Sequence, residues 1–143
     1  MSFIYERKIN YYETDRMGVV HHSNYIRFLE EARSRWLEKM KIPMEKLEQE
    51  GYTIPTIEVN CKYKYHVTSG DTIIIEPYIT EYNGVRMTIK YNVIDIKTGN
   101  RIIEAWTKHC FTDNNLKPVN MKKKNEKIYN IFEGLKKEAY NKE

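Results

Sequence analysis

The sequence predicts an α+β fold in which a curved antiparallel sheet wraps around one long helix. Two patterns predict it. Residues 24–40 place apolar side chains at the spacing of one helix face. Residues 57–112 then switch to the period-two alternation of strands, interrupted by short turns. Since one long helix can cover one face of such a sheet, we expect the sheet to curve around it. The 143 residues suit a single globular unit with its own core.

The long helix is predicted to begin after Ser23, a favourable N-cap, and to end near Lys41, because Pro43 disfavours helix at the residue before it. A strand is expected over residues 3–12, and a short helix over Met44–Glu50 that Gly51 ends. The apolar face of the long helix is predicted to comprise Tyr25, Phe28, Leu29, Ala32, Trp36 and Met40.

Four further strands are predicted, over residues 57–67, 72–82, 85–96 and 101–112. We expect an antiparallel meander, with Asn83-Gly84 as a two-residue hairpin turn and Pro77 at an edge or bulge. Because an unpaired edge strand invites another chain, we also expect at least a dimer. The first of the four strands is predicted to be half-buried, with one apolar face formed by Ile57, Val59, Cys61, Tyr63, Tyr65 and Val67.

The charge and composition exclude several classes of protein. The net charge of +4 resides in residues 117–143, which hold eight Lys and four Glu. We interpret this segment as a solvated, lysine-rich helical tail (121–143) after a domain over 1–120, with Ile128, Ile131, Phe132 and Leu135 as its apolar stripe. No signature of a nucleic-acid-binding protein accompanies it. No run is long enough to span a membrane, and the N-terminus lacks the core of a signal peptide, so we expect a cytoplasmic protein with reduced cysteines.

The segment from Thr14 to Tyr25 carries the candidate chemistry. It places Asp15, Gly18 and the pair His21-His22 just ahead of the long helix. A helix start offers unpaired N–H groups and partial positive charge, which can polarise a carbonyl while a nearby carboxylate attacks it or activates water. On spacing alone, an Asp here is more often a turn residue or a cap. The two histidines lack further ligands at metal-binding spacing, so no metal site is expected.

Together, residues 11–25 followed by Glu30-Glu31-Ala32-Arg33 resemble the hot-dog-fold acyl-CoA thioesterases, namely the 4-hydroxybenzoyl-CoA thioesterase group and its YbgC-like relatives. The D-x-x-G-x-V-x-x-x-x-Y pattern from Asp15 to Tyr25 carries the resemblance, which covers about residues 1–120. It implies the hot-dog fold and hydrolysis of an acyl-CoA to a carboxylic acid and free CoA, without a cofactor. It also implies a homodimer or homotetramer whose active site lies between subunits.

The resemblance implies roles for individual residues. Asp15 would be the nucleophile or general base, and the N–H near His22 would polarise the thioester oxygen. The His22 side chain and Tyr11 match positions of site residues in YbgC-like members. The remaining substrate-binding candidates are Gly18, Val19, Val20, Tyr25 and Arg86.

One departure from the family pattern leaves the substrate open. The 4-hydroxybenzoyl-CoA branch grips coenzyme A phosphate with a basic run at the hairpin that here reads Asn83-Gly84-Val85, and only Arg86 lies nearby in the sequence. Lys62, Lys64 and Lys90 are other basic candidates. An acyl-carrier-protein substrate therefore stays open. Two other hypotheses are a hydratase of the same fold and a non-catalytic module that binds acyl thioesters.

Overall fold

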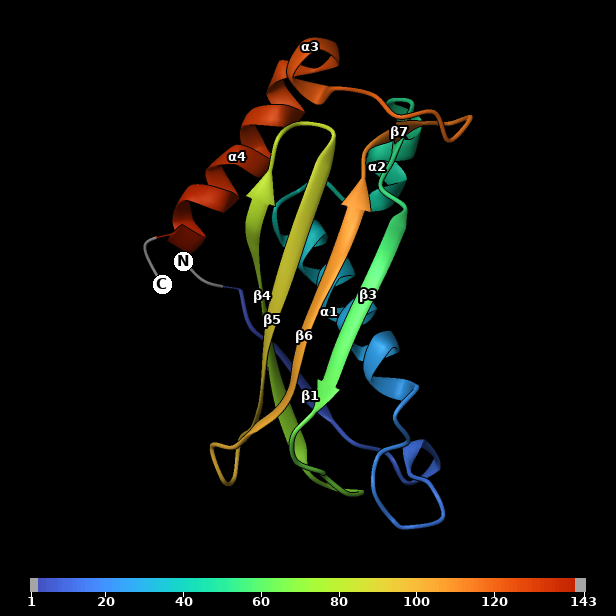
Figure 1. Cartoon of the computed structure of the whole chain (residues 1–143), viewed down its shortest axis with the longest axis vertical. Coiled ribbons are helices and arrows are strands. Elements are labelled where there is room, and N and C mark those ends of the chain that lie inside the picture. Colours follow the sequence, from blue (N-terminus) through green and yellow to red (C-terminus); the bar gives the residue numbers. More distant parts are fainter. Residues whose placement is uncertain (1–2, 141–143) are drawn as a thin grey trace. The chain divides into compact units, whose positions relative to one another are not determined.

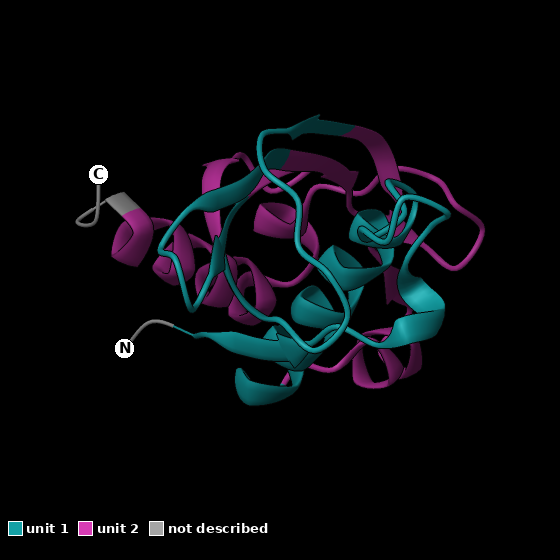
Figure 2. Cartoon of the chain, turned by 90° about the horizontal axis from the view of Figure 1, so that it is seen from below, with its two compact units in different colours: residues 1–41, 60–77, 91–105 teal, residues 42–59, 78–90, 106–143 magenta. Residues whose placement is uncertain are grey.

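The computed structural model describes residues 3–140 (Figure 1). The chain forms two compact units, coloured teal and magenta in Figure 2. Unit 1 comprises residues 1–41, 60–77 and 91–105, and unit 2 comprises residues 42–59, 78–90 and 106–143. Four strands contribute residues to both units. Because each unit has its own set of internal contacts, we describe them one at a time.

Five strands form one sheet in the order β1-β4-β5-β6-β3. Their bounds are Tyr5–Lys8 (β1), Thr56–Tyr63 (β3), Thr72–Tyr82 (β4), Arg86–Asp95 (β5) and Arg101–Cys110 (β6). The predicted meander is right for β4, β5 and β6. It is wrong for β3, which lies beside β6: the Lys64 N–H donates to the Ile102 carbonyl, and the Cys110 N–H donates to the Pro55 carbonyl. The place beside β4 is taken by β1, a long-range pairing that local alternation does not encode.

The pairing of β1 with β4 explains the proline inside β4. Tyr5 lies opposite Ile75, and Lys8 lies opposite Thr72. Ile75 is the last residue of β4 that pairs with β1, and Pro77 lies beyond it. No residue of β1 therefore needs a backbone N–H from position 77. The predicted edge position of Pro77 is confirmed.

The first strand is shorter than predicted, because β1 ends at Lys8 and the chain then forms a 3-10 turn, η1 (Tyr11–Glu13). The Glu13 side chain accepts a hydrogen bond from the Asn10 N–H at 2.9 Å, which closes a capping box around this turn. Tyr11 and Tyr12 consequently project into solvent, with 82% and 80% of their surface exposed.

In unit 1, the helix α1 (Asn24–Lys39) begins after Ser23 as predicted and ends two residues earlier than predicted. Its apolar stripe is buried as expected, apart from Met40, which follows the helix and is half-buried. The Arg33 guanidinium donates to the Tyr91 hydroxyl at 3.1 Å and so connects α1 to β5. Other buried apolar side chains of this core include Ile9, Val67, Ile73, Ile75, Val93, Ile102 and Ile103.

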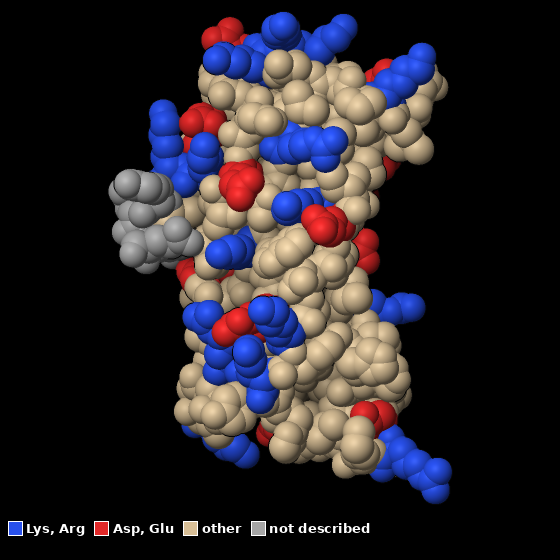
Figure 3. All heavy atoms as spheres, in the orientation of Figure 1, with Lys and Arg blue, Asp and Glu red and all other residues tan. Residues whose placement is uncertain are grey.

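In unit 2, the segment after residue 120 forms α3 (Met121–Lys124) and α4 (Glu126–Tyr140). The helix prediction is confirmed, and α4 is packed: the Phe132 ring lies 5.1 Å from Phe111 and 6.0 Å from Tyr82. Lys122–Lys124 are exposed. In Figure 3, blue side chains gather at the top of the view, where Figure 1 places α3. Residues 141–143 of the predicted tail lie outside the described residues, and the boundary between 1–120 and 121–143 stays a prediction.

The rest of unit 2 includes a short helix, α2 (Met44–Gln49), at the predicted place. It also includes a two-stranded sheet that was not predicted, in which β2 (Tyr52–Thr53) pairs with β7 (Thr112–Asp113). Strands of two residues are too short to show an alternation.

The turn between β4 and β5 has three residues, Asn83-Gly84-Val85, where two were predicted. The Asn83 side chain accepts hydrogen bonds from the Val85 and Arg86 N–H groups, at 2.9 and 2.8 Å. Gly84 has a φ of +92°, and a Cβ there would approach the Asn120 Oδ1 to 2.7 Å. Glycine is therefore required both by the backbone and by the neighbouring α3 segment.

The predicted apolar face of β3 is exposed in this chain, against expectation. Ile57, Val59, Tyr63 and Tyr65 are exposed by 47%, 38%, 49% and 58%, and only Val67 is buried. β3 also lies at the edge of the sheet, and no strand within residues 3–140 pairs with its outer side.

Candidate active site

Asp15 opens a tight loop in unit 1 that returns antiparallel to itself. The Asp15 N–H donates to the Val19 carbonyl at 2.7 Å, and the Gly18 N–H donates back to the Asp15 carbonyl at 2.9 Å. Thr14 and Val20 pair across the loop, and Val19 pairs with Thr68. Gly18 has a φ of +84°, which favours glycine over any side chain. The loop is thus fixed at both ends, and the carboxylate is held on a defined backbone.

The two oxygens of the Asp15 carboxylate differ in their contacts. Oδ1 accepts a hydrogen bond from the Met17 N–H at 2.8 Å, within the loop. Among residues 3–140, Oδ2 has no hydrogen-bond donor. Asp15 is half-buried, so this second oxygen is available for chemistry on a carboxylate whose orientation the first oxygen fixes.

Glu13 connects this loop to its surroundings. Its side chain pairs with Arg7 of β1. Its carbonyl accepts the His21 N–H at 2.9 Å and the Asn24 side-chain amide at 2.8 Å. A single residue therefore ties β1, the Asp15 loop and the start of α1 together.

Arg7 is shared between two carboxylates and one ring. Its Nε donates to Glu31 of α1 at 2.8 Å, and its guanidinium lies 4.1 Å from the centre of the Phe28 ring. Tyr5 also donates to Glu31, at 2.9 Å. Burial acts to lower the pKa of Arg7, but the two carboxylates outweigh burial and raise it, so the guanidinium stays charged.

The start of α1 lacks the cap that was predicted. Ser23 occupies the N-cap position, but its hydroxyl makes no capping bond and instead lies 2.8 Å from the His21 Nδ1. His22 is exposed, and its N–H donates to no acceptor within the described part of the chain. The N–H that the resemblance implies for polarising an oxygen is therefore free to donate to a ligand.

Aromatic side chains surround this helix start. The His22 ring stacks on His21 at 4.2 Å and meets the edge of Tyr63 at 6.2 Å. Tyr25 is buried between Phe28 and Tyr63, at 5.8 and 5.7 Å. Burial, with Cys61 nearby, raises the pKa of the Tyr25 hydroxyl, so it stays protonated at neutral pH.

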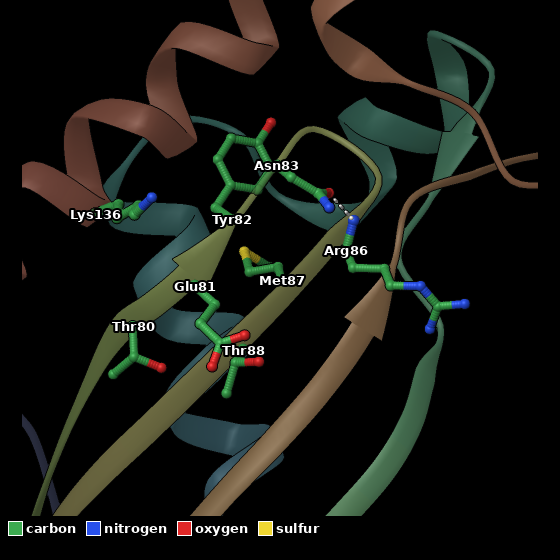
Figure 4. A pocket seen from close by; sticks show the side chains of 8 residues that line it. All are labelled: Thr80, Glu81, Tyr82, Asn83, Arg86, Met87, Thr88 and Lys136. Atoms are coloured by element: carbon green, nitrogen blue, oxygen red, sulfur yellow. Dashed lines mark hydrogen bonds between the residues drawn. The ribbon is translucent and has the colours of Figure 1, made fainter.

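Arg86 lies in unit 2, beside a pocket of about 320 Å³ at the hairpin (Figure 4). Glu81, Thr88 and Lys136 are among the side chains that line this pocket. Figure 4 shows the Arg86 guanidinium extending away from Lys136, which approaches from α4 on the opposite side. The charged side chains that line the pocket are thus Glu81, Arg86 and Lys136, and the Arg86 guanidinium is directed away from the other two.

The structure brings most of the predicted site residues together in unit 1. Asp15, Gly18, Val19 and Val20 form the loop, and His22 and Tyr25 form the helix start. The Tyr11 hydroxyl, although close in sequence, has no hydrogen-bond partner among the described residues. Four residues of this region were not among the candidates from the sequence, namely Arg7, Glu13, Glu31 and Tyr63. Glu13 and Glu31 stood within the stretch that carries the resemblance, whereas no spacing pattern singled out Arg7 or Tyr63.

The profile of the Thioesterase-like superfamily matches residues 9–129. A protein of Aquifex aeolicus that bears a provisional esterase name is 35% identical over 114 residues, which cover 80% of this chain and 88% of that protein. The chain belongs to the Thioesterase-like superfamily. Within this superfamily it is also similar to Bacillus subtilis YneP, provisionally named an acyl-CoA thioesterase, with 28% identity over 92% of this chain and 96% of that protein.

The likeness to solved structures confirms the predicted hot-dog fold. A hypothetical protein from Aquifex aeolicus superposes with a TM-score of 0.82 at 31% identity, covering 91% of this chain and 98% of the other. The DHNA-CoA thioesterase from Staphylococcus aureus superposes with a TM-score of 0.88 at 22% identity, covering 98% and 94%. The second likeness concerns the fold alone.

Within residues 3–140, no three His, Cys, Asp or Glu side chains gather where they can hold a metal ion. No helix in this part of the chain is both long and apolar enough to cross a membrane.

Glu13 makes the stability of the site region depend on pH. Burial acts to raise the pKa of its carboxyl, but hydrogen bonds from Arg7 and the Asn10 backbone, with the guanidinium charge, outweigh burial and lower it. Such a carboxyl adds stability above its unfolded pKa of about 4.3 and loses it as the pH falls through the folded value. We therefore expect the difference in unfolding free energy between the natural protein and Glu13→Gln to shrink from pH 7 to pH 3, measured by urea denaturation.

The matched control is Glu30→Gln, since Glu30 is exposed on α1. This variant should keep the pH dependence of the natural protein. A Glu13→Gln difference that stays constant with pH would contradict the assignment.

Proposed function

We propose that this protein hydrolyses acyl-CoA thioesters to a carboxylic acid and free CoA, with Asp15 as the catalytic carboxylate. The observation that carries the proposal is the combination, in unit 1, of a half-buried carboxylate with one free oxygen and a free main-chain N–H at the start of α1. The superfamily and the name of YneP support the same chemistry.

The reaction needs two elements, and both are present in unit 1. The Asp15 Oδ2 attacks the thioester carbon, or takes a proton from a water molecule that attacks it. The negative charge that develops on the thioester oxygen is stabilised by the His22 N–H and the positive end of α1. The bond to sulfur then breaks, and the thiolate leaves as CoA after taking up a proton. In the nucleophilic route, water subsequently hydrolyses the acyl–Asp15 intermediate.

The other candidate residues have proposed roles in binding the substrate. Gly18, Val19 and Val20 form the wall of the loop around the thioester, and Tyr25 supports it from the core. The His22 imidazole and the Tyr11 hydroxyl, both on exposed residues, contact the bound substrate. Arg86 binds a phosphate of the CoA nucleotide, with Lys136 as a second cation of the same pocket. A cytoplasmic location stays part of the proposal.

We also propose that the protein assembles at least as a homodimer through β3, as a dimer or a tetramer. Four large apolar side chains on or just after this edge strand are exposed, although their alternation is typical of a buried face. A second copy of the chain is the partner that would extend the sheet.

The first test removes the carboxylate. We expect Asp15→Ala to lower kcat by on the order of a thousandfold, because it removes a principal catalytic group. Release of free thiol from a panel of aliphatic and aromatic acyl-CoAs, followed with a chromogenic reagent, measures the effect. Glu30→Ala, which removes an exposed carboxylate of α1, is the control and should retain full activity. Unchanged turnover in Asp15→Ala would refute the mechanism.

The second test concerns the nucleotide. Arg86→Ala should raise KM for an acyl-CoA several-fold, because it removes roughly one contact to a phosphate. The value of kcat should change little. The same acyl group on pantetheine, which lacks the nucleotide phosphates, should be hydrolysed equally well by both proteins. An equal loss on both substrates would show that Arg86 acts in some other way.

The third test concerns assembly. Replacing Val59 with Lys places a charge on the exposed face of β3 and should shift the protein toward monomers in sedimentation velocity. Ile96→Lys, at an exposed apolar position outside β3, is the control and should leave the oligomer intact. A natural protein that sediments as a monomer at micromolar concentration would exclude the β3 interface.

A further inference from the structure

We propose that Tyr63 is a positioning residue for the reaction: its hydroxyl holds the main chain of His22 so that the His22 N–H faces the thioester oxygen. This inference rests on the function proposed above, and it assigns a role to a side chain that lies outside the Asp15 motif. Tyr63 is the last residue of β3 and donates a hydrogen bond to the His22 carbonyl at 3.1 Å.

The direction of the His22 N–H depends on two neighbouring peptide planes. The plane between His21 and His22 is fixed at its carbonyl, which accepts the Asn24 N–H at 2.9 Å. In a trans peptide the N–H points opposite to the carbonyl, so the His22 N–H points away from the body of α1. This plane can still rotate about the His22 Cα unless the following plane is also held.

Tyr63 holds the following plane, between His22 and Ser23. That plane is bound on both sides: its carbonyl accepts the Tyr63 hydroxyl, and its N–H donates to the His21 Nδ1 at 3.2 Å. With both planes held, the backbone angles of His22 are determined. An N–H held in place before the substrate arrives needs no reorganisation when charge develops on the thioester oxygen.

The ring of Tyr63 adds a second restraint. It meets the His22 ring edge-on at 6.2 Å and lies against the buried Tyr25 at 5.7 Å. Burial, with a contribution from the Cys61 thiol, raises the pKa of Tyr63 to about 12. The hydroxyl therefore stays protonated, and remains a donor, over the whole pH range in which thioesterase assays are run.

The strand also offers a matched control. Tyr65 follows two residues later and is exposed to a similar extent, and its hydroxyl makes no hydrogen bond within residues 3–140. Tyr63→Phe and Tyr65→Phe each remove one hydroxyl and leave the ring, so a difference between them isolates the bond to His22.

The experiment compares the two variants with the natural protein in three measurements. Tyr63→Phe should lower kcat about tenfold through misplacement of the N–H, with KM changed by less than about twofold. Its thermal midpoint and sedimentation coefficient should match those of the natural protein. Without substrate, the His22 amide resonance in a ¹⁵N–¹H spectrum should shift in Tyr63→Phe and stay in place in Tyr65→Phe.

The outcomes separate the two proposals. Equal kcat values for the two variants, or a Tyr63→Phe loss that follows a lowered thermal midpoint, would overturn the positioning role. If the natural protein releases no thiol from any acyl-CoA, the hydrolase proposal fails, and the amide spectrum still decides the role of Tyr63. An unmoved His22 resonance in Tyr63→Phe would then overturn it.

Discussion

The pairing of Arg7 with Glu13 is the constraint on which the arrangement of the site depends. Glu13 directly precedes the Thr14-Asp15 pair, so whatever holds Glu13 sets where the Asp15 loop begins. Both partners are largely buried, with 14% and 7% of their side-chain surface exposed. Buried charges are costly unless their hydrogen bonds are complete, and here Arg7 also has Glu31 while Glu13 also has the Asn10 N–H. The pair therefore specifies one position for the loop.

Hydrogen bonds connect Glu13 to the residues around the His22 N–H, the proposed donor to the thioester oxygen. The Glu13 carbonyl accepts the His21 N–H, and His21 in turn binds Ser23 through its ring. Ser23 cannot cap α1 while its hydroxyl lies against that ring. A Ser23 cap would accept from N–H groups of the first turn of α1. The His22 N–H precedes the N-cap and has no acceptor among the described residues, so this donor does not depend on the cap.

The sequence predicted the elements that repeat and the residues that lie close together along the chain. The stripe of α1 and the alternation of β4, β5 and β6 follow local periods, so they were predicted well. The Asp15-Gly18 loop was found because its residues are adjacent. Arg7, Glu31 and Tyr63 were missed because each acts across a turn or between elements. Their partners are set by the order β1-β4-β5-β6-β3, which the alternation of single strands cannot reveal.

The prediction that β3 buries one apolar face is wrong for this chain. Its alternation of apolar side chains is real, yet the face that they form is exposed in this chain. Tyr63 differs from Ile57 and Val59 because its hydroxyl turns to His22 while much of its ring stays in solvent. If a second chain covers this face, as we propose, assembly would also exclude water from Tyr63 and strengthen its bond to the helix start. Dimer formation and the positioning of the His22 N–H would then depend on the same strand.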